Sequence, residues 1–177
     1  MKENYERLPQ NIKRLLYRKD ISNTNQPVFL IGFSGCGKST LGAMIAQKTE
    51  KKFIDIDNYI VTKHNQSISQ IFADKGEQGF RLIEKEALNE ILNLKNIIIA
   101  TGGGTPCFFD NMELMNKNGI TIYLKLSPEK LFERLVTDKK SRPLLTEKDD
   151  KELLEYINNE LRKREKYYEK AKINFSI

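Results

Sequence analysis

The sequence has few of the residues that build metal centres or covalent cross-links. Its 177 residues include one histidine, His64, two cysteines, Cys36 and Cys107, and no tryptophan. Two cysteines supply neither a disulfide framework nor a four-ligand zinc site, and one histidine cannot form a multi-histidine metal site. Because so little cysteine is typical of a reducing compartment, we expect a cytoplasmic protein.

Long apolar runs are missing as well. Uninterrupted apolar stretches such as 97–100 fall far short of the roughly 20 residues of a membrane helix, and no secretory signal pattern opens the chain. The net charge is +6, but its basic residues are spread along the chain. This spread favours an enzyme that handles small polyanions over a nucleic-acid-binding protein. We therefore expect a monomer with no membrane or nucleic-acid partner.

Short apolar segments alternate with segments of helical periodicity. Segments 28–31, 52–55, 96–100, 120–126 and 172–177 are typical of strands. Strands that alternate with helices predict a parallel sheet covered by helices on both faces. The fold class we expect is α/β: one domain with a five-stranded parallel sheet in a three-layer sandwich, with ligands beyond the carboxyl ends of the strands.

A glycine-rich motif follows the first of these strands. Residues 32–39 read GFSGCGKS and match G-x-x-x-x-G-K-[ST], with a predicted helix directly after them. Backbone amides in such a loop converge on phosphate oxygens at the positive end of the helix. We predict that Lys38 reaches the outer phosphates of a nucleotide and that the Ser39 hydroxyl is a ligand for Mg²⁺.

The loop motif alone does not separate kinases from GTPases and motor ATPases. The chain has no Asn-Lys-x-Asp guanine signature and no apolar strand that ends in Asp-Glu. A small chain with a basic, loop-like segment near Arg142 favours a kinase that acts on a small molecule.

Two further motifs follow predicted strands. Asp55 and Asp57 end the second strand, where alternation would place both carboxylates on one face. One near Mg²⁺ and one near an acceptor hydroxyl would suit phosphoryl transfer; the alternative is that Asp57 merely caps the next helix. Glycines 102–104 follow the third strand, where they would either bring backbone N–H groups to a ligand or form a tight turn.

Two segments have the apolar spacing of amphipathic helices. In the first, Phe80, Ile83 and Ala87 belong to an apolar stripe with Arg81 and Glu84 outside it, after a turn at 75–76. In the second, within residues 1–26, apolar side chains recur at helical spacing. We expect this N-terminal extension to form a short helix that packs on the body or on a partner chain, and residues 27–177 to form a single domain.

The segment 67–84, SISQIFADKGEQGFRLIE, resembles the signature of the shikimate kinases, which phosphorylate the 3-hydroxyl of shikimate. Other pieces agree in type and order: the glycine-rich loop, DID at 55–57, ATGGG at 100–104, SRPLL at 141–145 and LRKREKYY at 161–168. The resemblance covers about 28–177. It implies ATP-dependent formation of shikimate 3-phosphate and ADP, a step of chorismate and aromatic amino acid biosynthesis.

The resemblance also implies roles for individual residues. For ATP it assigns Gly35, Cys36, Gly37, Lys38, Ser39, Thr40, Arg134 and Arg142. For Mg²⁺ it assigns Ser39 and Asp55. For shikimate it assigns Asp57, Arg81, Gly103, Gly104 and Arg164, with both of these arginines at the carboxylate. The implied catalytic residues are Lys38, Asp57 as the candidate base, and Arg142, which would reach the transferred phosphate.

The implied architecture places the substrate between helices at about 57–94 and a closing lid at about 138–150. Phe72 and Phe80 would wall the pocket, and Glu84 would orient an arginine. The chain departs from the family at both ends: residues 1–26 precede the usual start, and the usual adenine-contacting segment and final helix after the last strand are missing. Two alternatives stay open, a kinase for another sugar-like hydroxy acid and a catalytically inactive nucleotide-binding protein.

Overall fold

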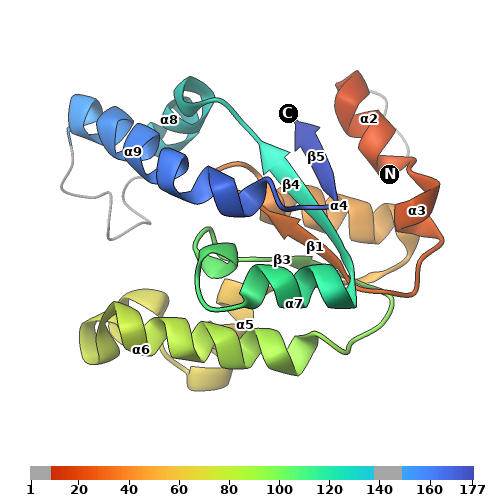
Figure 1. Ribbon diagram of the computed structural model, residues 1–177, viewed down its shortest axis with the longest axis horizontal. Helices are drawn as coiled ribbons and strands as arrows, with labels where there is room; N and C mark the ends of the chain where they lie inside the picture. The colour runs from red at the N-terminus through yellow and green to blue at the C-terminus, as the bar shows by residue number, and fades with distance from the viewer. Residues whose placement is uncertain (1–8, 138–148) are drawn as a thin grey trace.

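A single parallel sheet forms the centre of the protein. The computed structural model describes residues 9–137 and 149–177 (Figure 1). In chain order the strands are β1 Val28–Ile31, β2 Lys52–Asp55, β3 Ile97–Ala100, β4 Ile120–Lys125 and β5 Ile173–Ser176. All neighbouring strands pair in parallel, in the order β2-β3-β1-β4-β5. The predicted five-stranded parallel sheet is therefore confirmed.

Burial of the strands follows their apolar content. β1 and β3 consist of VFLI and IIIA, and every residue in both is buried. The edge strands β2 and β5, KFID and INFS, are only partly buried. Continuous apolar runs are typical of central parallel strands, which are covered on both faces.

Helices cover both faces of the sheet. Figure 1 shows α7 (Asn111–Asn118) and α9 (Asp150–Tyr168) in front of the sheet and α4 (Lys38–Thr49) behind it. α8 (Pro128–Thr137) packs on α9, and α5 (Ile56–His64) packs on α6 (Ile68–Ile91) beside β2. A short 3₁₀ helix, η1, spans Thr105–Cys107. Among these described helices, none is both long and apolar enough to cross a membrane.

The helix α6 carries a kink where a turn is expected. Ser67 and Gln70 form a reciprocal capping box at its start, which satisfies two backbone donors. Gly76 then takes φ 66° and ψ −177°, outside the helical region, in a conformation that glycine adopts with little strain. The amphipathic part of α6 follows this kink.

The N-terminal segment packs on the body of the protein. It forms α2 (Gln10–Leu16) and α3 (Lys19–Ser22), and α2 lies against α4. Leu15 of α2 and Ile21 of α3 are fully buried in the core. Asn11 also donates a hydrogen bond to the Ser176 carbonyl of the edge strand β5, at 3.1 Å. The described part of this segment is thus two short helices, and its separation from residues 27–177 as an extension stays a prediction.

We predict that α2 contributes substantially to the stability of the whole domain. Replacing Leu15 with alanine removes a fully buried side chain, so it should lower the free energy of unfolding by about 2–4 kcal/mol. Arg14→Ala, at an exposed position of the same helix, should change it by less than about 0.5 kcal/mol. Urea unfolding measures both. A Leu15→Ala variant as stable as Arg14→Ala would show that α2 is only loosely attached.

Candidate active site

The register of the sheet brings three of the predicted motifs together. β1 and β3 pair Leu30 with Ala100, and β2 and β3 pair Asp55 with Ala100. The segments that follow these three strands therefore emerge side by side at the carboxyl edge, where ligands bind in open parallel sheets. A cleft of about 360 Å³ lies at this edge. Its lining residues are Ser34, Gly35, Gly37, Lys38, Ser39, Thr40, Asp55, Asp57, Thr101, Gly103, Arg134 and Leu135.

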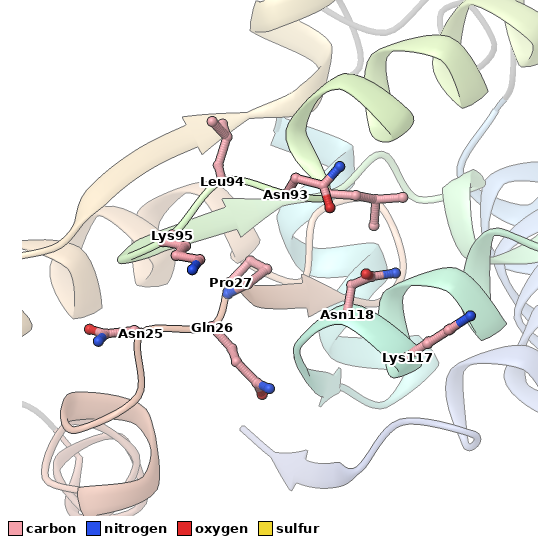
Figure 2. A pocket seen from close by; sticks show the side chains of 9 residues that line it. Asn25, Gln26, Pro27, Asn93, Leu94, Lys95, Lys117 and Asn118 are labelled. Atoms are coloured by element: carbon pink, nitrogen blue, oxygen red, sulfur yellow. The ribbon is translucent and has the colours of Figure 1, made fainter.

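A second cavity lies at the opposite, amino-terminal edge of the sheet. It has a volume of about 440 Å³, and exposed side chains such as Asn25, Lys95 and Lys117 surround it (Figure 2). None of the predicted site residues lines it. The chemistry expected from the sequence therefore belongs to the smaller cleft.

The glycine-rich loop surrounds the ammonium group of Lys38. Gly37 takes φ 97°, a left-handed conformation that lets the chain turn directly into α4. The buried Lys38 Nζ donates to the carbonyl oxygens of Gly32 and Phe33, both at 2.9 Å. From α8, Arg134 donates to the Cys36 carbonyl at 3.2 Å. Two cations from different helices thus meet at this loop.

Ser39 and Asp55 form an oxygen-rich pair beside the loop. The Ser39 hydroxyl donates to Asp55 Oδ2 at 2.5 Å. The other oxygen, Oδ1, accepts from the backbone N–H groups of Asp57 at 3.1 Å and Asn58 at 3.3 Å, so Asp55 is the N-cap of α5. The alternative in which Asp57 caps the helix is therefore wrong. Asp57 lies in the first helical turn, so strand alternation is not what places the two carboxylates together.

Asp57 is a carboxyl group surrounded by protein. Burial raises its pKa to about 6, and the negative charges of Glu84 and Asp55 add to the increase, while Lys38 and Arg81 oppose it. A pKa in this range leaves most of the group ionised at neutral pH and still able to accept a proton. The environment of Asp57 therefore suits a general base.

Glu84 lies at the centre of a buried ion-pair network. It is only 1% exposed, which contradicts the expectation that it lies outside the buried stripe of α6. Arg81 donates to Glu84 Oε2 at 2.9 Å, and the Thr105 hydroxyl donates to Oε1 at 2.5 Å. These partners compensate the buried carboxylate. Glu84 thus holds the guanidinium of Arg81 in place.

Arg81 contacts aromatic rings and a second carboxylate. Its guanidinium lies 4.2 Å from the centre of the Phe108 ring, and it donates to Glu77 at 3.1 Å. Within the described residues its buried Nε has no hydrogen-bond partner. Phe72 and Phe80 stack beside it, with 4.5 Å between ring centres.

Three glycines after β3 pass between these charged groups. A side-chain carbon at Gly102 would lie 2.6 Å from Glu84 Oε1, and one at Gly104 would lie 2.7 Å from the nitrogens of Arg81. At Gly103 it would lie 3.0–3.1 Å from Ser34 of the glycine-rich loop. A side chain at Gly102 or Gly104 would displace the carboxylate of Glu84 or the guanidinium of Arg81, so the motif brings backbone close to charged side chains rather than forming only a turn.

Arg164 of α9 approaches the same region from another side. It donates to Glu160 at 2.6 Å, and its guanidinium lies 5.4 Å from the centre of the Phe33 ring. Burial raises the pKa of the Cys107 thiol to about 11, against the opposing charges of Arg164 and Arg81. Both guanidinium groups therefore lie near this one thiol.

The structure thus brings together predicted residues from α4, α5, α6, α8, α9 and the loop after β3. Arg142 and most of the expected lid, 138–150, lie outside the described residues. Sequence reasoning missed Phe33, Phe108 and Thr105, whose contacts depend on tertiary structure. It also missed Glu77 and Glu160, although each lies four residues before its arginine, a spacing at which helical side chains pair.

The fold and the cleft define a class of protein. A glycine-rich phosphate loop, a hydroxyl–carboxylate pair and a buried carboxylate of raised pKa meet at the carboxyl edge of a parallel sheet. This is the arrangement of a P-loop kinase that phosphorylates a small molecule.

Comparisons with known proteins identify the family. A family model described as shikimate kinase matches residues 34–176. The chain is 46% identical over 145 residues to a shikimate kinase of Phocaeicola vulgatus, covering 82% of this chain and 83% of the relative. It is 48% identical over 151 residues to one of Azobacteroides pseudotrichonymphae, covering 85% and 89%.

Solved structures agree with these relatives. A crystal structure of shikimate kinase from Bacteroides thetaiotaomicron superimposes with a TM-score of 0.83 at 42% identity, covering 85% of this chain and 86% of that one. One from Acinetobacter baumannii in complex with shikimate gives 0.79 at 34% identity, covering 87% and 84%. The chain belongs to the shikimate kinase family, and its activity is that of an ATP-dependent phosphotransferase of this family.

The pKa of Asp57 predicts opposite effects on activity and stability. If Asp57 is the base, kcat/KM should fall about tenfold per pH unit below pH 6, and Asp57→Asn should lower kcat by roughly 100-fold or more. Folding raises the pKa of Asp57 from 3.8 to about 6. The ionised carboxylate therefore destabilises the fold more and more as the pH rises from 3.8 to about 6, and by a constant amount above pH 6. Asp57→Asn should therefore stabilise the free protein at pH 7.5, by up to about 3 kcal/mol, and less at pH 5.

Unfolding by urea at both pH values tests the stability effect. Asp110→Asn is a suitable control, because the hydrogen bond from Lys85 lowers the pKa of Asp110 instead of raising it. The control variant should gain no stability at pH 7.5. A kcat/KM profile that stays flat to pH 5 would remove Asp57 from the role of base.

Proposed function

We propose that the cleft transfers the γ-phosphoryl group of ATP to the 3-hydroxyl of shikimate. The hydroxyl oxygen bonds to the γ-phosphorus while the bond from that phosphorus to the β–γ bridging oxygen breaks. The hydroxyl proton passes to Asp57, and the products are shikimate 3-phosphate and ADP. The observation that carries this proposal is that Asp57 lines the cleft together with Lys38 and has the raised pKa of a base, with Lys38 and Arg81 both acting on it electrostatically.

The phosphate side of the cleft is built from the glycine-rich loop. In this proposal the amides of 35–40 and Lys38 hold the phosphates of ATP, and Arg134 flanks the adenine from α8. Lys38 now donates to loop carbonyls at 2.9 Å, which holds its ammonium at the loop before nucleotide binds. The charge that stabilises the transferring phosphate is thus in place in advance, as electrostatic catalysis requires.

Ser39 and Asp55 fit a magnesium ion. Mg²⁺ prefers oxygen ligands and is usually held by one or two protein groups together with phosphates and water. The hydroxyl and carboxylate here lie 2.5 Å apart at the cleft, and the described residues hold no group of three or more His, Cys, Asp or Glu side chains placed to bind a metal ion by themselves. When bound, the ion would supply positive charge to neutralise the ATP phosphates.

The acceptor side supplies the partners for a carboxylate. Shikimate is a carboxylic acid, and a guanidinium can form two parallel hydrogen bonds to such a group. We assign the carboxylate to Arg81 and Arg164 and the substrate hydroxyls to Asp57 and the backbone of Gly103 and Gly104. The unpartnered Nε of Arg81 and the closeness of both guanidiniums to Cys107 support this assignment. Phe72 and Phe80 would form an apolar wall.

We further propose a cytoplasmic monomer that works in chorismate and aromatic amino acid biosynthesis. Both cysteines are free thiols, which supports a reducing compartment.

Lys38 tests the phosphate side of this proposal. Lys38→Ala removes the positive charge nearest the outer phosphates and should lower kcat by roughly 100-fold or more while the far-ultraviolet circular dichroism is retained. Lys48→Ala, at an exposed position of the same helix, should keep more than half of the activity. A coupled ADP-release assay measures both. If Lys38→Ala kept more than a tenth of the rate, the loop would not be the phosphate site.

Arg81 tests the acceptor side. Arg81→Lys keeps the positive charge but loses the planar fork, so KM for shikimate should rise about tenfold while KM for ATP changes little. Arg162→Lys, at an exposed position on α9, should change neither constant. Steady-state kinetics with each substrate varied in turn separates the two effects.

An amide analogue of shikimate completes this test. The analogue lacks the carboxylate charge, so it should lose little further between the wild type and Arg81→Lys. If the wild type phosphorylated the amide as well as shikimate, the carboxylate clamp would not exist and the acceptor would be a different compound.

A further inference from the structure

The hydroxyl of Tyr168 reaches from α9 to the glycines after β3. Tyr168 is fully buried, and its hydroxyl donates a hydrogen bond to the carbonyl oxygen of Gly103, 65 residues away in the chain. The rest of its side chain packs in the core, with its ring 5.2 Å from that of Tyr123. A buried tyrosine needs partners for its hydroxyl, and here they are the Gly103 carbonyl, in a loop that faces the cleft, and Arg164 of the same helix.

The bonded carbonyl controls the direction of a neighbouring donor. The Gly103 carbonyl and the Gly104 N–H belong to one planar, trans peptide, in which the two groups point in opposite directions. Fixing the carbonyl toward Tyr168 therefore fixes the Gly104 N–H away from it. Neither Gly103 nor Gly104 donates its N–H to another backbone group within the described residues. Gly103 also lines the cleft, so this stretch presents backbone at the site that is not committed to a backbone hydrogen bond.

The same peptide lies against Arg81 of the proposed clamp and is bonded to the helix that carries Arg164. Gly104 is so close to Arg81 that a side-chain carbon there would lie 2.7 Å from either terminal nitrogen of the guanidinium. Tyr168 lies four residues after Arg164, one turn along the same helix α9. The hydrogen bond from Tyr168 to Gly103 therefore ties the turn that carries Arg164 to the loop that touches Arg81.

We propose that Tyr168 is a positioning residue for the acceptor site. It does not touch the substrate; it holds the Gly103–Gly104 peptide in the orientation that binds shikimate and keeps α9 in register with this loop. Glycine backbone has many accessible conformations, so an anchor from outside the loop is needed to select one of them. This inference rests on the proposed function, because it requires that Gly103 and Gly104 bind the substrate.

Tyr168→Phe removes the hydroxyl and keeps the ring. The Gly103 carbonyl then loses its buried partner, and the loop is no longer held in one orientation. We expect KM for shikimate to rise about three- to tenfold and KM for ATP to stay within about twofold. Tyr123→Phe is the matched control, because Tyr123 is equally buried against the same ring and the Gly103 carbonyl accepts from Tyr168 instead.

The kinetic pattern distinguishes positioning from stability. If Tyr168→Phe raised both KM values together, or matched Tyr123→Phe in both, the residue would be only part of the core and the inference would fail. If shikimate KM rose in Arg81→Lys but not in Tyr168→Phe, the clamp would stand and the role of Tyr168 alone would be refuted. If neither variant changed it, the proposed acceptor site itself would be wrong. Calorimetric titration with shikimate provides the same comparison without turnover.

Discussion

The charge of one buried carboxylate, Glu84, organises the acceptor side of this protein. With 1% of its surface exposed, Glu84 depends on partners inside the protein, which are Arg81 and Thr105. Removing one partner of such a pair leaves an uncompensated buried charge, which is strongly destabilising. The same charge raises the pKa of Asp57. One carboxylate therefore fixes the guanidinium of Arg81 and raises the pKa of Asp57, the two groups proposed to bind the acceptor and to take its proton.

Close backbone approach joins the acceptor side to the phosphate side. Ser34 of the glycine-rich loop lies where a side chain at position 103 would begin, and Glu84 and Asp57 lie where one at position 102 would begin. A methyl group at either position would push the two loops or the two carboxylates apart. Phosphoryl transfer depends on the placement of donor and acceptor. Small displacements at these glycines would therefore slow the reaction by changing that placement. The glycines thus set the spacing between the two halves of the cleft.

The sequence predicts what short-range patterns encode. The strands, the glycine-rich loop before α4 and the turn at 75–76 follow from apolar runs, motif spacing and glycine, and the structure confirms them. Alternation past Asp55 predicts that Asp57 belongs to the strand. In the structure Asp55 caps α5 and the strand ends there, so Asp57 lies in the helix. Glu84 is expected outside the apolar stripe because it is charged, whereas in the structure Arg81 and Thr105 satisfy that charge inside the protein. The contacts of Phe108, Phe33 and Tyr168 depend on how separate elements pack, which periodicity does not record.

The electrostatics of the cleft also link the acceptor to the basicity of Asp57. Lys38 and Arg81 both lower the pKa of Asp57, against burial and two neighbouring carboxylates. In the proposed reaction the carboxylate of shikimate meets Arg81, whereas the phosphates of ATP arrive with Mg²⁺, whose positive charge opposes theirs. Shikimate then offsets part of the positive charge that favours ionised Asp57, so the pKa of Asp57 rises further. A carboxylate of higher pKa accepts a proton more readily, provided that it is still ionised. Asp57 would thus become the stronger base once the acceptor is in place.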